Sequence, residues 1–273
     1  AQGQGVATMI AQIVADVLTV LPDSIEVVAG DTAATPAGLG AYASRQAVTA
    51  GNAAHAAAQL VVDKAKAAAA ALLEASVDDL EMRDGAVRVK GVPGHGKTLT
   101  EIARSLAGVP GHGKTLTEIA RSLAGAPGFA LPGNLPPGLA ASNDFMTSGL
   151  CYTNGAHVAE VEVDPRTGEV RIERYIVVHD CGRMINPMMV EGQIHGAIVH
   201  GVGMTLHEWM RYDSNGQPLN GNYADYLLPT ADVSPRIEIH HMETPTPLNP
   251  LGAKGAAESG TIGAPAAIVS AIE

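Results

Sequence analysis

The chain of 273 residues contains few cysteines, few aromatic residues and no excess of positive charge. Its two cysteines, Cys151 and Cys181, are too few for a disulfide framework, which favours a reducing, cytoplasmic location. Seventeen Lys and Arg residues stand against 28 Asp and Glu residues, giving a formal net charge of −11, and 3% of the residues are aromatic. Without a basic stripe or aromatic residues that stack on bases, nucleic-acid binding is not expected.

Long apolar runs are also missing. The longest runs, such as residues 67–73, fall far short of the roughly 20 residues that a membrane-spanning helix needs, so no membrane span is expected. Hydrophobic residues nevertheless make up 46% of the chain, enough to bury the core of one large domain or two smaller ones. The chain opens without Met in a Gly/Gln-rich string and ends at Glu273 in an uncapped helical pattern. We therefore expect it to be a fragment of a larger polypeptide.

Hydrophobic periodicity predicts helices and strands that occur in clusters, not in strict βαβ alternation. Helices are predicted over residues 7–19, 48–75 and 188–209, and from Pro265 onward. Strands are predicted over residues 24–29, 157–163, 169–178 and 236–241, with hairpins within 80–90 (turn at Asp84-Gly85) and around 213–217. The expected fold class is α+β, with mixed sheets and packed helices.

A 17-residue segment occurs twice in tandem without a single change, as residues 91–107 and 108–124. Two copies are too few for a solenoid, so we interpret them as a duplication in a surface connection or an error in the sequence. A Pro/Gly-rich linker at 126–139 then separates a first α+β subdomain, residues 1–125, from a second, residues 140–273.

Each copy of this segment matches the phosphate-binding P-loop pattern, with Gly91, Gly96, Lys97 and Thr98 in the first copy. A nucleoside-triphosphate hydrolase is therefore one alternative function. Against it, the first copy follows a hairpin strand where a buried parallel strand is needed, and two P-loops 17 residues apart would collide. We interpret the match as accidental.

Ten histidines raise the question of a metal site. His195 and His200 lie five residues apart in a predicted helix and do not share a face. The adjacent His240 and His241 point to opposite sides of a predicted strand, and the sequence has no Cys-x-x-Cys motif. No metal held by protein side chains is expected.

One carboxylate, Glu258, stands in a run of very small residues that also contains Lys254 and Gly255. Small residues allow a bulky cofactor to approach the backbone, and a carboxylate beside such a cofactor can act as a general base. The alternative interpretation is a solvated glutamate in a flexible turn.

Three further segments carry groups that suit an anionic cofactor. Gly3-Gln4-Gly5 leads into a predicted helix, whose first amides attract anions. Tyr42-Ala43-Ser44-Arg45 offers backbone amides, a hydroxyl and a guanidinium, and Gln193 presents an amide on a Gly-rich helix. Together these segments predict a large phosphorylated cofactor that lies across several loops.

Five motifs occur in order along the chain: GQG followed by AQI, GDT followed by GAYASR, GAHVAEVEVDPRTGEV, HDCGRMINPMMVEGQIHGAIVHGVG, and NPLGAKGAAESGTIGAPAAI. This order resembles the large subunit of the molybdenum hydroxylases, the family of xanthine dehydrogenase, aldehyde oxidoreductase and aerobic carbon monoxide dehydrogenase. The resemblance covers most of the chain outside residues 91–128 and is to the second molybdopterin-binding domain, in the C-terminal half of that subunit.

The resemblance implies that Glu258 is the catalytic carboxylate, which takes a proton from a molybdenum-bound hydroxyl. It also implies that Gln4 and Gln193 bind the pterin and its phosphate, and that the loop around Ala43 and Ser44 holds the phosphate. The metal is then held by the pterin dithiolene, not by side chains. The chain departs from the family at Val6-Ala7, where His-Glu is frequent, and at Ala257, where Gly is usual.

The implied reaction oxidises an aldehyde, an N-heterocycle or carbon monoxide with water-derived oxygen, at molybdopterin in its cytosine dinucleotide form. The implied partners are the N-terminal half of the same subunit, iron–sulfur and FAD subunits, and a small-molecule substrate, since the chain has neither a ferredoxin-like cysteine pattern nor a flavin fingerprint. By itself the fragment is expected to be inactive. The alternative is a non-catalytic module that only holds the pterin or packs against other subunits.

Overall fold

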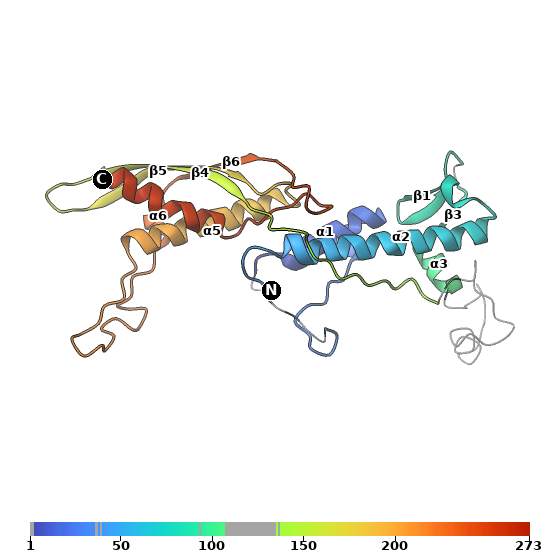
Figure 1. Ribbon diagram of the computed structural model, residues 1–273, viewed down its shortest axis with the longest axis horizontal. Coiled ribbons are helices and arrows are strands. Elements are labelled where there is room, and N and C mark those ends of the chain that lie inside the picture. Colours follow the sequence, from blue (N-terminus) through green and yellow to red (C-terminus); the bar gives the residue numbers. More distant parts are fainter. Residues whose placement is uncertain (1–2, 36–37, 39, 93, 107–134, 136) are drawn as a thin grey trace. The chain divides into compact units, whose positions relative to one another are not determined.

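The computed structural model describes residues 3–35, 38, 40–92, 94–106, 135 and 137–273. The second copy of the tandem segment, 108–124, and most of the predicted linker at 126–139 lie outside these residues. The chain forms two compact units (Figure 1): an amino-terminal unit of residues 7–34 and 50–146, and a carboxy-terminal unit of residues 1–6, 35–49 and 147–273. No helix within the described ranges is both long and apolar enough to cross a membrane.

The amino-terminal unit is built around an alanine-rich helix that packs on a small antiparallel sheet. Helix α2 buries Ala65, Ala68 and Ala69, whose small side chains allow the helix to approach the sheet closely. Leu80 and Ile102 complete the core from the sheet and from the following helix. In chain order the elements are α1 (Val6–Leu18), α2 (Asn52–Leu73), β1 (Leu80–Arg83), β2 (Ala86–Val89), β3 (Gly96–Thr98) and α3 (Leu99–Leu106).

Three predictions for this unit are confirmed. The helix predicted over 7–19 is α1, and the one predicted over 48–75 is α2, preceded by the short π-helix η2, Ala47–Gly51. The turn at Asp84-Gly85 joins β1 to β2 with left-handed φ values of 50° and 67°. Two successive left-handed residues are what a two-residue type I′ hairpin turn requires.

The strand predicted over residues 24–29 is wrong. Pro22–Ser24 forms the short 3-10 helix η1, and residues 25–29 pair with no strand in the described part of the chain. The side chains from Ile25 to Val28 alternate between half-buried and exposed, which explains the strand-like pattern. A strand also needs the edge of a neighbouring strand, and the alternation alone does not supply one.

The first copy of the tandem segment does not form a phosphate loop. Gly96–Thr98 is strand β3, in which Lys97 pairs with Val87 of β2. Thr98 then caps α3: its hydroxyl accepts a hydrogen bond from the Glu101 amide at 3.2 Å, and the Glu101 carboxylate accepts one from the Thr98 amide at 2.8 Å. A P-loop lysine instead enters the helix that follows the loop, so this geometry argues against nucleotide hydrolysis.

The carboxy-terminal unit has a three-stranded mixed sheet with two helices on one face (Figure 1). Strands β4 (Asn154–Val163) and β5 (Val170–Asp180) are antiparallel, and β6 (Ile237–Met242) runs parallel to β5. Between this face and helices α5 (Pro187–Leu206) and α6 (Ser259–Ile272) lies a core of Tyr175, Val177, Ile194, Ile198, Val202, Ala264 and Ile268. The predicted hairpin over 157–178, helix over 188–209, strand over 236–241, turn at 213–217 and α+β class are confirmed.

Helix α6 begins at Ser259, six residues before its predicted start at Pro265. Pro265 lies inside the helix, which loses one backbone hydrogen bond there. The prediction was wrong because proline is favoured in the first turn of a helix, and the Gly/Ala-rich residues before Pro265 have no clear periodicity. As a consequence, Glu258 does not lie in a free loop: it occupies the N-cap position of the helix, where its side chain makes no capping hydrogen bond.

The two units differ from the contiguous subdomains 1–125 and 140–273 that the linker suggests. Residues 1–6 and 35–49 belong to the carboxy-terminal unit, although α1 and α2 on either side of 35–49 belong to the other unit. From the predicted linker, Leu135 and Leu139 pack against the amino-terminal core. The units interleave in sequence because contacts over long separations, described next, bind residues 35–49 to the end of the chain.

Candidate functional site

Glu258 is joined to Ser44 by two reciprocal hydrogen bonds. The Ser44 hydroxyl donates to Glu258 Oε2 at 2.8 Å, and the Glu258 amide donates to Ser44 Oγ at 3.0 Å. The glutamate is exposed, as the alternative interpretation of the sequence has it, but its position is fixed at the first turn of α6. One carboxylate oxygen is therefore held by the protein, and Oε1 forms no hydrogen bond with any of the described residues.

The loop that carries Ser44 has a costly backbone conformation. Ala43 and Ser44 have left-handed φ values of 52° and 51°, which are unfavourable for residues with a Cβ. Gly255 lies so close to this loop that a Cβ on it would stand 3.0 Å from Ser44 Cβ and 3.2 Å from the Ser44 carbonyl oxygen. The predicted site residue Gly255 thus allows the Ser44 loop and the Glu258 segment to touch.

Arg45 and Tyr42, both predicted site residues, lie against each other. The Arg45 guanidinium carbon stands 4.0 Å from the centre of the Tyr42 ring, a cation–π contact that orients the guanidinium. Arg45 Nε is buried and has no hydrogen-bond partner among the described residues. A buried N–H donor without a partner is rare in folded proteins, so this atom suits an anionic ligand.

The Gly3-Gln4-Gly5 segment lies beside the first turn of α5. A Cβ on Gly5 would overlap the Met189 side chain, and Asn186 caps this turn by accepting a hydrogen bond from the Met189 amide at 3.1 Å. Gln193 follows Met189 by four residues and so shares its face of α5. Contacts thus join the predicted residues Ser44, Gly255 and Glu258 and set Gly5 beside Met189, while helix spacing alone places Gln193 on this face of α5.

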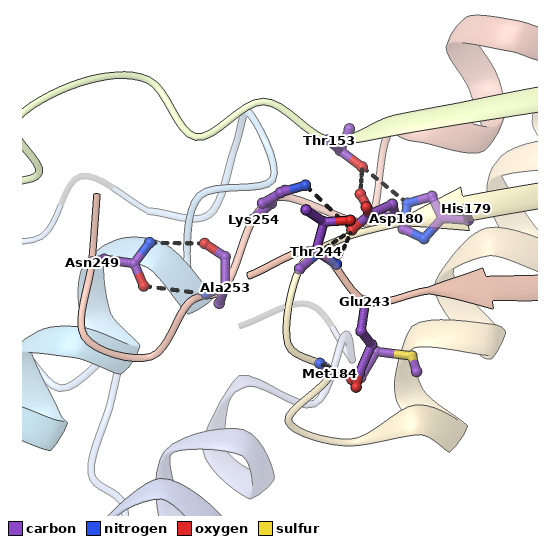
Figure 2. Close-up of polar contacts among 10 residues, drawn as sticks. Thr153, His179, Asp180, Met184, Glu243, Thr244, Asn249, Ala253 and Lys254 are labelled. Carbon is purple, nitrogen blue, oxygen red and sulfur yellow. Dashed lines mark hydrogen bonds and ion pairs between the residues drawn. The ribbon is translucent and has the colours of Figure 1, made fainter. Parts of the chain in front are cut away.

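Lys254 makes a different contact from those of the other predicted site residues (Figure 2). Its ammonium stands 3.3 Å from Asp180 Oδ1, and both side chains are buried, with 8% and 9% of their surface exposed. Burial opposes the charge of Asp180, but hydrogen bonds from Thr244 and the Gly182 amide, together with Lys254, lower the pKa of the carboxyl to about 2. Lys254 is thus paired with a charge of its own chain, and its role toward a cofactor stays a prediction.

Three residues missed by the sequence analysis hold the segment before Glu258 in place: Asp180, Gly182 and Asn249. The Asn249 side chain donates to the Ala253 carbonyl at 2.8 Å and accepts from the Ala253 amide at 3.2 Å (Figure 2). Gly182, with a φ of 67°, lies so close to Gly252 that a Cβ would stand 2.2 Å from the Gly252 carbonyl oxygen. The signal was present in the HDCG and NPLGAKG motifs, where polar residues and glycines are adjacent.

A second polar cluster lies under the helices of the same unit, at His179 and His241. His179 is 1% exposed, its Nε2 lies 3.1 Å from Thr153 Oγ1, and its ring packs edge-on against His241. His240 is exposed and His241 is not, as alternation along a strand predicts. Within the described residues, no three His, Cys, Asp or Glu side chains are placed to hold a metal ion.

We expect His179 to make the protein sensitive to acid. Burial, with a smaller effect from His241, lowers the pKa of His179 from 6.5 to about 4. The unfolded state then binds a proton that the folded state does not, so stability is present above pH 6.5 and falls between pH 6.5 and 4, by up to about 3 kcal/mol since one pKa unit corresponds to about 1.4 kcal/mol. Urea unfolding at a series of pH values measures this change.

The matched comparison is between His179→Gln and His240→Gln. His240 is exposed and His179 is buried, so the two variants make the same chemical change in the two environments. The His179→Gln variant should show a flatter dependence of unfolding free energy on pH, whatever its absolute stability. Equal slopes in both variants would contradict the assignment to His179.

Comparisons with known proteins point to one family. A sequence profile of the molybdopterin cofactor-binding domain matches residues 1–235. The gamma subunit of the 6-hydroxypseudooxynicotine dehydrogenase complex of Paenarthrobacter nicotinovorans is 42% identical over 272 residues, which are 99% of this chain and 32% of that subunit.

Two solved structures share the fold over the whole chain. The Cu,Mo carbon monoxide dehydrogenase matches with a TM-score of 0.83 and 36% identity, over 99% of this chain and 31% of that one. Quinoline 2-oxidoreductase from Pseudomonas putida 86 matches with a TM-score of 0.81 and 39% identity, over 100% of this chain and 32% of that one. The chain spans about a third of the length of the relatives it matches.

Proposed function

Since the profile of the molybdopterin cofactor-binding domain matches residues 1–235, the chain belongs to that domain family. We propose that it is part of the large subunit of a molybdenum hydroxylase. The proposed reaction oxidises an aldehyde, an N-heterocycle or carbon monoxide with oxygen from water. The observation that carries the proposal is the Ser44–Glu258 pair, which fixes a carboxylate beside a loop suited to an anionic cofactor.

The proposal extends to the rest of the enzyme. It includes the cytosine dinucleotide form of the cofactor, an N-terminal part of the same subunit, iron–sulfur and FAD subunits, and a cytoplasmic location. The motif resemblance supports these points, and one relative is the gamma subunit of a dehydrogenase complex.

The residues around Ser44 fit a pterin phosphate. The buried Arg45 Nε, which has no partner in the part of the chain that the structure describes, offers a charged donor. Charge-assisted hydrogen bonds from a guanidinium to phosphate are among the strongest in proteins. Arg45 with the Ser44 loop, and Gln4 with Gln193 on α5, would hold the cofactor. When bound, the cofactor supplies the two-electron redox chemistry.

Glu258 is suited to act as the base of the proposed reaction. The Ser44 hydroxyl holds Oε2, and the Glu258 amide is bound to the same hydroxyl, so the carboxylate cannot rotate freely. Oε1 is then the atom that accepts a proton during turnover.

Replacement of Arg45 tests the cofactor-binding part of the proposal. We expect Arg45→Met to weaken retention of the cofactor about tenfold or more in the complete subunit, since a hydrogen bond to a charged group contributes about 1.5–3 kcal/mol. Molybdenum by elemental analysis and pterin released on denaturation, both measured after extensive dialysis, report the retained fraction.

The matched control is Arg166→Met in the turn between β4 and β5. Its side chain is 89% exposed, so the same chemical change should leave molybdenum and pterin content unaltered. Equal cofactor content in both variants would remove Arg45 from the binding site. A wild-type subunit without molybdenum or pterin would remove the proposed function.

A further inference from the structure

We propose that the buried Asp180–Lys254 ion pair is a positioning device for Glu258. This inference rests on the proposed function, because it assigns Lys254 a role in placing the base of that reaction. Lys254 precedes Glu258 by four residues, and Asp180 is the last residue of the central strand β5. The pair thus joins the segment that carries Glu258 to the central strand of the sheet, which is hydrogen-bonded to a neighbour on each side.

Asp180 is the point at which three parts of the chain meet. Its Oδ1 accepts hydrogen bonds from the Thr244 amide at 3.2 Å and the Lys254 ammonium at 3.3 Å (Figure 2). It also accepts one from the Gly182 amide at 2.8 Å. These donors follow β6, precede α6 and follow β5, respectively. The charge of Asp180 is compensated by the charge of Lys254 and by these donors. Removal of either charged side chain would leave the other charge buried without its counter-charge.

The backbone beside the pair is held in the same place. The Lys254 amide donates to the Cys181 carbonyl at 2.7 Å, and the Arg183 amide donates to the Gly252 carbonyl at 3.1 Å. These bonds flank an isolated bridge between Gly182 and Ala253. The segment 252–254 therefore extends the sheet by a short antiparallel contact, and the ion pair lies across it.

Lys254 affects the position of Glu258 through Gly255 and Ser44. Gly255, the next residue, lies against Ser44, and Ser44 holds the Glu258 carboxylate and amide. A shift of Lys254 therefore moves Gly255 against the Ser44 loop and alters the direction of the carboxylate. A displacement of about 1 Å at a reacting group can reduce turnover about 100-fold.

The other role open to Lys254 is direct binding of a cofactor anion. An ammonium that binds an external anion needs access to it, whereas the Lys254 side chain is 8% exposed and already faces a carboxylate. The two roles make opposite predictions for Asp180. A positioning pair needs both residues, whereas an anion-binding lysine does not need the acid beside it.

The test compares Lys254→Met, Asp180→Asn and the double variant in the cofactor-loaded holoenzyme. We expect both single variants to lower kcat about 10- to 100-fold with KM and molybdenum content unchanged. We also expect faster amide hydrogen exchange in peptides covering residues 252–260 and no change in peptides from α5. In a Glu258→Gln background, Lys254→Met should cause no further loss, because it acts through the missing base.

The double variant keeps the inference testable where a lone buried charge prevents folding. With neither charge present it should fold, yet show the same low kcat and fast exchange over 252–260. The matched control is the Arg174–Glu238 pair of the same sheet, joined at 2.7 Å, whose side chains are 49% and 24% exposed. Arg174→Met and Glu238→Gln should change neither property.

Three results would overturn the inference. The first is full turnover in the double variant. The second is loss of molybdenum and pterin in Lys254→Met while Asp180→Asn retains both cofactor and turnover, which would make Lys254 a cofactor ligand. The third is unchanged exchange over 252–260 in all variants. A wild-type holoenzyme without turnover would instead count against the proposed function, and the exchange measurement would still decide the role of the pair.

Discussion

Glu258→Gln should reduce turnover of the complete enzyme by about 10²–10⁴-fold, the range that a general base contributes. The substitution removes the ability to accept a proton and keeps the shape of the side chain. The new amide oxygen can still accept from the Ser44 hydroxyl, and the backbone amide still donates to it. Molybdenum and pterin content should therefore stay at the wild-type level, and steady-state kinetics on the same preparation measures the loss.

The control for this variant is Glu173→Gln, the same change at an exposed glutamate of β5. It should leave turnover unchanged. Retained activity in Glu258→Gln would refute the assignment of Glu258 as the base. A complete enzyme with bound pterin but no turnover, before any substitution, would favour the alternative of a non-catalytic module.

Gly182→Ala should strongly destabilise the carboxy-terminal unit, for two separate reasons. The left-handed φ of 67° costs an alanine about 1–2 kcal/mol. The added Cβ would also stand 2.2 Å from the Gly252 carbonyl oxygen, and overlap of this kind costs about another 1–3 kcal/mol. Because that carbonyl accepts from Arg183, any shift that relieves the overlap disrupts the contact between 181–183 and 252–254.

Gly168→Ala separates the cost of the left-handed backbone from the cost of the steric overlap. Gly168 has a similar left-handed φ of 76°, but a Cβ there meets nothing within 4 Å. Its variant should lose only the backbone contribution, about 1–2 kcal/mol. Urea unfolding of both variants measures the difference, and equal losses would show that the close contact between Gly182 and Gly252 does not contribute to stability.

Periodicity and turn residues were sufficient for most elements of the fold. The alternation in 157–178, the alanine-rich face of 48–75 and Asp84-Gly85 each have one local physical cause, and each is confirmed. The predictions of a strand at 24–29 and of the start of the last helix were wrong because hydrophobic periodicity does not report tertiary packing. Residues 24–29 alternate but have no neighbouring strand to pair with in the described part of the chain. The first turns of α6 form a helix although their Gly/Ala-rich sequence has no hydrophobic periodicity.

The sequence was sufficient to predict which residues form the site, but not which of them touch one another. Small residues around Glu258 and the hydroxyl of Ser44 were visible in the sequence, but nothing local indicates that they meet across 214 residues. Lys254 shows the limit most clearly. A lysine among glycines is typical of anion binding, and only the tertiary structure places Asp180 against it.

That separation of 214 residues between Ser44 and Glu258 also bears on the order of events in the cell. Contacts between residues far apart in sequence form late in folding, because a long loop must close first. During synthesis the Ser44 loop leaves the ribosome long before the segment that fixes it. The two halves of the carboxylate site therefore come together only once translation of this region is finished. Delivery of a large cofactor is accordingly expected to be post-translational, to a chain in which Ser44 and Glu258 are already in contact.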